Sequence, residues 1–347
     1  MKLPSVSSAC FGSFLQQIPA SSQIVRYYHV HDLCLKIVSN RSDLLQLFDE
    51  LLGCFQSPDF SGEPSLALNL YAIPSECAPS FQIPKNWSLY DRTSHISCYL
   101  CDHALFYQYK RQGMFFADIE QGYGLGYITI PYSDQDSLNI YQNIWLLALF
   151  HIMRARNVFP LHASAALFKE KGVLIAGASG QGKTTLLLHL LRAGFQYMAD
   201  DTVLLRQDAD SLKMLSFPAT IRITAETTSL FPELSSFIRE TQPDRRGKYH
   251  IEPQKLSLLP PPHSAIPAFV LLPEITAGEE TAIVPISRMA GAIQCIPQNT
   301  PVNKLGISRN NFDLLCRLFH HAQCYQLRLG QNMNSIGRQI ADVMCDV

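Results

Sequence analysis

The spacing of apolar residues in the first half of the chain predicts alternating strands and helices. Residues 33–38 alternate as in a strand, whereas the Leu and Phe residues of 43–52 recur at helical spacing and end at Gly53. A loop is expected over 56–65 because Pro, Gly and Ser are frequent there. Short apolar runs then predict strands at about 66–72, 95–101, 104–109, 113–118 and 124–130.

A helix over about 137–156, with Asp134 or Asp136 as its cap, ends this half. We therefore expect an N-terminal mixed α/β domain over 1–155 and a second domain over 156–347. The N-terminal domain carries no assignable motif, so substrate recognition is one hypothesis for its role.

The second half begins with a predicted strand, turn and strand over 161–177, followed by a helix over 183–193 and a strand over 195–199. Gly194 is expected to end the helix. Three consecutive prolines at 260–262 indicate a stiff connector. Beyond them the pattern predicts a strand at 268–272, a strand and helix near 281–296, a helix near 311–321, a strand at 325–329 and a terminal helix.

Composition narrows the class of protein. The 347 residues are 47% hydrophobic and 16% charged, which is enough apolar surface for two folded cores. A net charge of −1 argues against a nucleic-acid-binding protein. The longest nearly apolar run, 144–152, is too short to span a membrane, and the first residues do not resemble a secretion signal. We expect a cytoplasmic protein whose ten cysteines are mostly reduced.

The segment 173–184, VLIAGASGQGKT, fits the phosphate-binding pattern G-x-x-x-x-G-K-[ST], with an apolar strand before it and a Leu-rich helix after it. Its glycines allow backbone N–H groups to point at phosphate oxygens, and the helix N-terminus adds a partial positive charge. Lys183 is expected to reach the β- and γ-phosphates, and Thr184 to ligate Mg²⁺. The expected nucleotide-binding residues are Gly177, Ala178, Ser179, Gly180, Gln181, Gly182, Lys183, Thr184 and Thr185.

The lengths of the next helix and strand predict that two carboxylates lie beside this loop. The helix over 183–193 and the returning strand each cover about 16 Å, so Asp200 and Asp201 should lie level with the phosphate loop. Neighbouring strand residues face opposite ways, so the pair is expected to divide two roles, base and metal ligand.

His162 is the third expected neighbour of the loop. If residue 168 pairs with 173 across a turn at 169–172, residue 162 lies opposite 179. An imidazolium there could contact the γ-phosphoryl group or tune an aspartate, although a packed core histidine is also compatible with this pattern.

His162, the loop 177–184 and Ala199-Asp200-Asp201 together resemble the HPr kinase/phosphorylase family, and most closely its relatives associated with peptide maturation. The resemblance implies a P-loop kinase of the phosphoenolpyruvate-carboxykinase-like α/β fold that uses ATP and Mg²⁺. It also implies roles: Asp200 as base, His162 and Lys183 as assisting residues, and Thr184 and Asp201 at the metal. Residues 217–223 depart from the Glu/Arg-rich segment of HPr kinases, so HPr as the acceptor and reverse phosphorolysis do not follow from it.

Other candidate residues have weaker support from the sequence. Arg245, Arg246 and Lys248 form a basic cluster that could stabilise the transferring phosphoryl group or could be a solvated loop, and Arg222 is a weaker candidate of the same kind. Cys98 and Cys101, flanked by histidines, lack a second pair at zinc-site spacing, which favours a structural interpretation.

The sequence thus predicts a kinase that phosphorylates a serine or threonine of a peptide or small protein. It predicts no nucleic-acid or membrane partner, and it is compatible with a homo-oligomer. Two alternatives remain open: a kinase for a small hydroxyl compound such as a free amino acid or sugar, and an ATP-gated binding protein without phosphoryl transfer.

Overall fold

The computed structural model describes residues 22–346 except 59–61, 79–82, 84, 93–94, 111, 141–143, 209–210, 245–246, 257, 277, 279 and 300–306. The chain divides into two compact units, Met1–Arg156 and Asn157–Val347. Both combine helices with mixed sheets, so the predicted α/β class is confirmed. No helix within the described ranges is long and apolar enough to cross a membrane.

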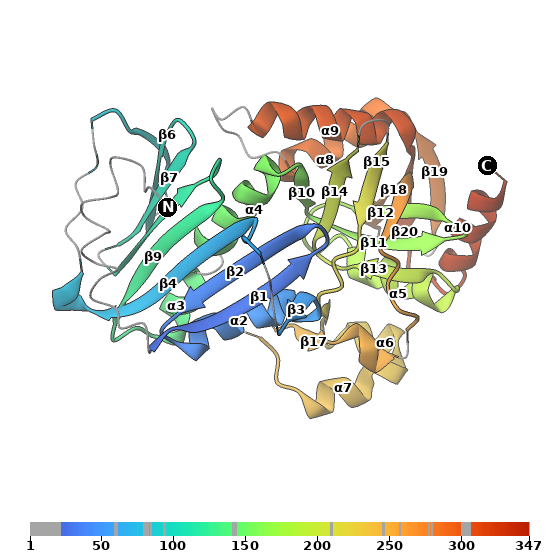
Figure 1. Cartoon of the computed structure of the whole chain (residues 1–347). Helices are drawn as coiled ribbons and strands as arrows, with labels where there is room; N and C mark the ends of the chain where they lie inside the picture. Colours follow the sequence, from blue (N-terminus) through green and yellow to red (C-terminus); the bar gives the residue numbers. More distant parts are fainter. Residues whose placement is uncertain are drawn as a thin grey trace. The chain divides into compact units, whose positions relative to one another are not determined.

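The first unit is built on one sheet of nine described strands (Figure 1). In spatial order these are β3 (Gln56–Ser57), β1 (Ile24–Val30), β2 (Leu33–Ser39), β4 (Leu66–Pro74), β9 (Tyr123–Ile130), β8 (Gly113–Asp118), β7 (Ala104–Tyr109), β6 (Ile96–Cys101) and β5 (Ser88–Arg92). Only the β2–β4 and β4–β9 pairs are parallel among them. The strand β3 falls within the stretch predicted as a loop.

Helices α2 (Ser42–Leu52), α3 (Asp134–Ile140) and α4 (Leu146–Ala155) complete this unit. The helix predicted over 137–156 coincides with α3 and α4, and residues 141–143 between them lie outside the described residues. The predicted caps are wrong: the Ser133 hydroxyl accepts the Asp136 N–H at 3.2 Å, while the Asp136 carboxylate accepts the Ser133 N–H at 3.3 Å. This reciprocal capping starts α3 at Asp134.

The second unit also holds a mixed sheet of nine described strands. Its main path runs β10 (Val158–Leu161), β14 (Val203–Gln207), β15 (Leu212–Leu215), β18 (Ser264–Ile275), β12 (Lys171–Ala176), β11 (Ala163–Phe168) and β13 (Gln196–Ala199). The strand β20 (Gln323–Leu329) pairs with β18 and with β19 (Ala282–Ile286). A separate ribbon joins β16 (Ile221–Ile223) to β17 (Tyr249–Ile251).

Helices cover both faces of this sheet. The helices α5 (Lys183–Arg192) and α10 (Ile336–Cys345) share a core with Phe269 and Leu271 of β18. The helices α8 (Arg288–Asn299) and α9 (Ile307–His321) pack on each other, on β18 and on β20 (Figure 1). The short helices α6 (Thr227–Leu230) and α7 (Ser235–Glu240) lie between the ribbon strands in sequence.

The start of this unit differs from prediction in two ways. The strand expected over 161–168 is two strands, since β10 pairs with β14 and β11 pairs with β12 and β13. The β11–β12 register pairs Phe168 with Lys171, because Lys169 and Glu170 form a two-residue turn with φ of 45° and 68°. The register error is two residues, so the faces of the strand are unchanged.

Candidate active site

The loop 177–182 joins β12 to α5, with its three glycines at positive φ as expected from the sequence. Gly177, Gly180 and Gly182 have φ of 152°, 85° and 87°, and Gly182 directly precedes the first residue of α5. The Gln181 side-chain oxygen accepts the Ala178 N–H at 2.5 Å, which ties the two sides of the loop together. The backbone here is thus held in the conformation that only glycine adopts without strain.

Lys183, the first residue of α5, is held inside this loop. Its Nζ donates to the carbonyl oxygens of Gly177 at 2.8 Å and Ala178 at 3.1 Å, and contacts His162 Nε2 at 3.1 Å. Burial lowers the pKa of Lys183, and the Lys248 cation lowers it further, while Asp201 and Asp200 oppose these effects. All three acceptors of the ammonium group are neutral, so its charge is only partly compensated.

His162 lies between the end of β10 and the start of β11, where the chain passes from one part of the sheet to another. Its Nδ1 is 3.0 Å from the Asp201 carbonyl oxygen and 3.3 Å from Asp201 Oδ1. Because an ammonium group can only donate, Nε2 accepts from Lys183 and the ring proton is assigned to Nδ1. The His162 ring therefore links Lys183 to Asp201.

Asp200 is enclosed. Its side chain accepts hydrogen bonds from Ser164 Oγ at 2.6 Å, from Thr184 Oγ1 at 3.1 and 3.2 Å, and from the Arg222 N–H at 3.2 Å. The residue is 2% exposed. Burial raises the pKa of Asp200, and these hydrogen bonds partly offset the rise.

Asp201 faces the opposite way and its side chain is 34% exposed. It accepts Arg222 Nη1 at 2.9 Å and lies beside His162. Thr184 is the neighbour of Asp200, whereas the sequence grouped Thr184 with Asp201. The alternation of strand residues could not settle this, because Asp201 lies beyond the end of β13 with φ of 68°.

Four described residues of the β16–β17 ribbon and its connection bring further polar groups to the site. Arg222 pairs with His250 across the ribbon, and His250 Nε2 contacts Asp244 Oδ2 at 3.1 Å. Asp244 also accepts the Lys248 N–H at 2.9 Å, which fixes the backbone of half-buried Lys248. Arg245 and Arg246, predicted with Lys248, lie outside the described residues.

Ser164 and the Asp244–His250 pair were not identified as site residues from the sequence. Ser164 carried a usable signal, since it stands two residues after His162 in a strand and therefore shares its face. Nothing local in the sequence links Asp244 and His250 to a loop more than sixty residues earlier.

The donors around the loop fit Mg²⁺. A hydroxyl at Thr184 and carboxylates at Asp200 and Asp201 are hard oxygen ligands, and Mg²⁺ commonly takes one or two carboxylates together with substrate phosphates. Within the part of the chain that the structure describes, no group of three or more His, Cys, Asp or Glu residues could hold a metal by itself. Cys98 is buried and Cys101 half-buried, which agrees with their structural interpretation.

Comparisons with known proteins point to one family. No family model matches the chain. HPr kinase/phosphorylase from Exiguobacterium sp. is 47% identical over 51 residues, which are 15% of this chain and 16% of that protein. The solved structure of the Hpr(Ser) kinase/phosphatase from Coxiella burnetii matches over 54% of this chain and 88% of that chain, at 16% identity and a TM-score of 0.32. The local sequence similarity confirms the resemblance to HPr kinase/phosphorylase predicted from the motifs.

Proposed function

We propose that the second unit is an ATP- and Mg²⁺-dependent kinase that transfers the γ-phosphoryl group to a serine or threonine hydroxyl of a peptide or small protein. The observation that carries this proposal is the convergence of Lys183, His162, Asp200 and Asp201 on a glycine-rich loop at one edge of the sheet. A loop that only held phosphate would need neither carboxylate beside it.

The loop and Lys183 would bind the triphosphate. The acceptors that now hold the Lys183 ammonium group are carbonyl oxygens and an imidazole nitrogen. A negatively charged phosphate oxygen is a stronger acceptor than any of these, so Lys183 would turn to the β- and γ-phosphates. Mg²⁺, when bound near Thr184, would neutralise charge on the phosphate oxygens.

The contacts favour Asp201 as the base and Asp200 as the carboxylate on the metal side, the reverse of the roles expected from the sequence. Asp200 has its acceptor positions filled by Ser164, Thr184 and the Arg222 N–H, and it is almost inaccessible to an acceptor. Asp201 is half-exposed and is oriented by Arg222 and His162.

The proposed reaction transfers one phosphoryl group and one proton. The acceptor oxygen attacks the γ-phosphorus as its proton passes to the Asp201 carboxylate, and the bond to the bridging oxygen breaks to release ADP. Lys183 and Lys248 stabilise the charge on the transferring group, with Lys248 contributing because its cation already acts on Lys183. The Exiguobacterium relative is named HPr kinase/phosphorylase, which supports kinase chemistry at this site.

The test is transfer of label from γ-labelled ATP to peptides and small proteins encoded beside this gene, with Asp201→Asn and the surface control Asp208→Asn. We expect labelled serine or threonine with the wild type and with Asp208→Asn, and a loss of about a hundredfold or more in kcat with Asp201→Asn. Label on a free amino acid or sugar would instead support the small-molecule kinase. Binding of Mg·ATP without any transfer would support the sensor and contradict the kinase.

A further inference from the structure

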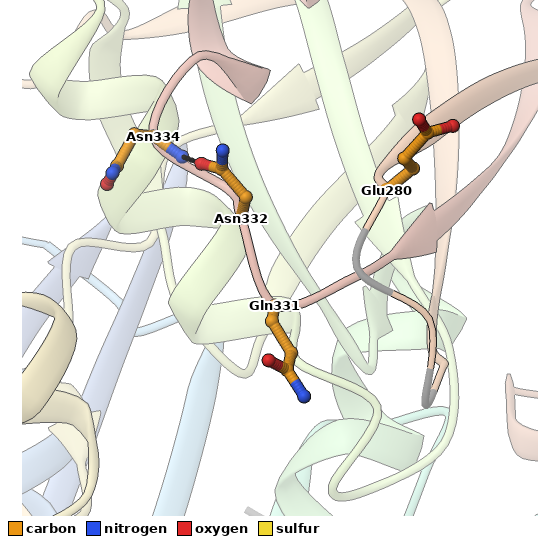
Figure 2. A pocket seen from close by; sticks show the side chains of 4 residues that line it. All are labelled: Glu280, Gln331, Asn332 and Asn334. Atoms are coloured by element: carbon orange, nitrogen blue, oxygen red, sulfur yellow. Dashed lines mark hydrogen bonds between the residues drawn. The ribbon is translucent and has the colours of Figure 1, made fainter.

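Two loops beyond the phosphate loop line an open pocket that the proposed chemistry does not use, and the four residues that line it are exposed. The pocket has a volume of about 450 Å³ and is lined by Glu280, Gln331, Asn332 and Asn334. Figure 2 shows the three amide side chains along one segment and the Glu280 carboxylate on the neighbouring one. Glu280 follows β18 in the chain, and the amide residues follow β20.

Strand direction places this pocket at the same edge of the sheet as the phosphate loop. The strands β12, β18 and β20 are parallel neighbours, so the segments that follow them emerge together. Contact distances agree: a Cβ on Gly182 would lie 3.3 Å from Leu329 Cδ1 and 3.7 Å from Ile275 Cδ1, the last residues of β20 and β18. The pocket residues begin only two residues after Leu329.

The order of the strands separates two sides of the phosphate loop. β11, which His162 precedes, and β13, which the two aspartates follow, lie on one side of β12, while β18 and β20 lie on the other. The γ-phosphate of a bound nucleotide must lie on the side of the aspartates for transfer to occur. The opposite end of the nucleotide, its sugar and base, then extends toward β18 and β20.

The pocket segments are braced before any ligand binds. The Gln331 N–H donates to the Gly278 carbonyl at 3.2 Å, and the Thr281 hydroxyl donates to the Asn332 carbonyl at 3.0 Å. The Glu280 carboxylate and the Gln331 side-chain amide make no hydrogen bond with any residue that the structure describes. Their polar atoms therefore remain available on a supported backbone.

We propose that this pocket binds the nucleoside part of ATP, an inference that rests on the proposed kinase function. The Glu280 carboxylate, which can only accept hydrogen bonds, takes the ribose hydroxyls. The amides of Gln331, Asn332 and Asn334 both donate and accept, as the edges of a nucleobase require. Specificity for a nucleoside is thus separate from phosphate binding, on which Lys183 acts.

The experiment measures dissociation constants of the full chain for three probes with Mg²⁺: ATP, 2′,3′-dideoxy-ATP and inorganic triphosphate. For the wild type we expect ATP to bind at least tenfold tighter than either of the other two. Glu280→Gln should lose about tenfold in ATP affinity, leave triphosphate unchanged and no longer distinguish ATP from the dideoxy analogue. The matched control is Glu240→Gln, an exposed glutamate at the end of α7 that should change nothing.

Other outcomes overturn the assignment. Equal binding of ATP and triphosphate by the wild type would mean that the pocket contributes nothing, while phosphate binding by the loop would stand. A Glu280→Gln variant with unchanged ATP affinity but a raised KM for the acceptor would assign the pocket to the acceptor. Binding of neither ATP nor triphosphate by the wild type would remove the proposed function, and this inference with it.

Discussion

Both units bury ionisable side chains in an α/β core, but the buried groups have different surroundings. In the first unit burial lowers the pKa of His151 to about 3, helped by the Arg154 cation, and raises the pKa of Tyr107 well above its usual value. These residues come from the middle of α4 and β7. In the second unit burial lowers the pKa of Lys183 and raises that of Asp200.

The difference lies in where the groups sit on their elements. Lys183 begins a helix, Asp200 follows a strand and His162 precedes one, so all three meet at a sheet edge with a loop that can admit a ligand. His151 and Tyr107 belong to the interior of their elements. A perturbed pKa alone therefore does not mark a functional site, whereas convergence of such groups at the ends of several elements does.

The largest expected effect separates the two units. Lys183→Met should lower turnover by about a thousandfold, because it removes the cation nearest the expected phosphates. His151→Gln in the first unit should leave turnover within about twofold in protein that remains folded. The measurement is labelled transfer under saturating ATP, with exposed Lys255→Met as the control. Equal losses of turnover from Lys183→Met and His151→Gln would contradict the difference between the two units.

A smaller effect should divide the two aspartates. Asp200→Asn should raise the Mg²⁺ concentration needed for half-maximal activity by about tenfold to a hundredfold, because its carboxylate contacts Thr184. Asp201→Asn should lower kcat with little change in that concentration. Activity measured across a Mg²⁺ series gives both values. A shift in Mg²⁺ requirement with Asp201→Asn alone would return the roles to those expected from the sequence.

A pH dependence of stability is expected from His189 of α5, whose pKa burial lowers to about 4. Its folded pKa lies below the ordinary value of 6.5, so the unfolded chain binds more protons between pH 6.5 and 4. The free energy of unfolding of the second unit should therefore fall as pH falls through that window, by at most about 3 kcal/mol. Urea unfolding of the wild type and His189→Gln checks this, and an unchanged slope in the variant would contradict it.

The smallest effect concerns the turn between β11 and β12. Glu170 has φ of 68°, a conformation that glycine adopts more easily. Glu170→Gly should stabilise the second unit by about 1 kcal/mol without changing activity. Thermal unfolding measures the gain. The same substitution at Glu280 or at other exposed glutamates should not stabilise the unit. A loss of stability would indicate that the Glu170 side chain supports the turn.

Local pattern predicted much of the site. The glycine loop, its strand and its helix are contiguous in sequence. The equal lengths of the helix and the following strand predicted both aspartates level with the loop, where Asp200 contacts Thr184. The β11–β12 register was wrong by two residues because Lys169 and Glu170 take left-handed conformations without the Asn or Gly that usually indicates such a turn.

Contacts between distant segments could not be predicted. The Arg222 N–H that closes off Asp200, the Asp244–His250 pair that holds Lys248, and the pocket around Glu280 each depend on the order of strands in the sheet. That order decided which aspartate is exposed, and the proposed reversal of the two roles rests on this exposure.

The most direct test of the account is calorimetric titration of the full chain with Mg·ATP. We predict one nucleotide bound per chain by the wild type, and binding weakened at least tenfold by Lys183→Met, with Lys255→Met unchanged. Absence of nucleotide binding by the folded wild type, or equal binding by Lys183→Met, would contradict a nucleotide site at this loop.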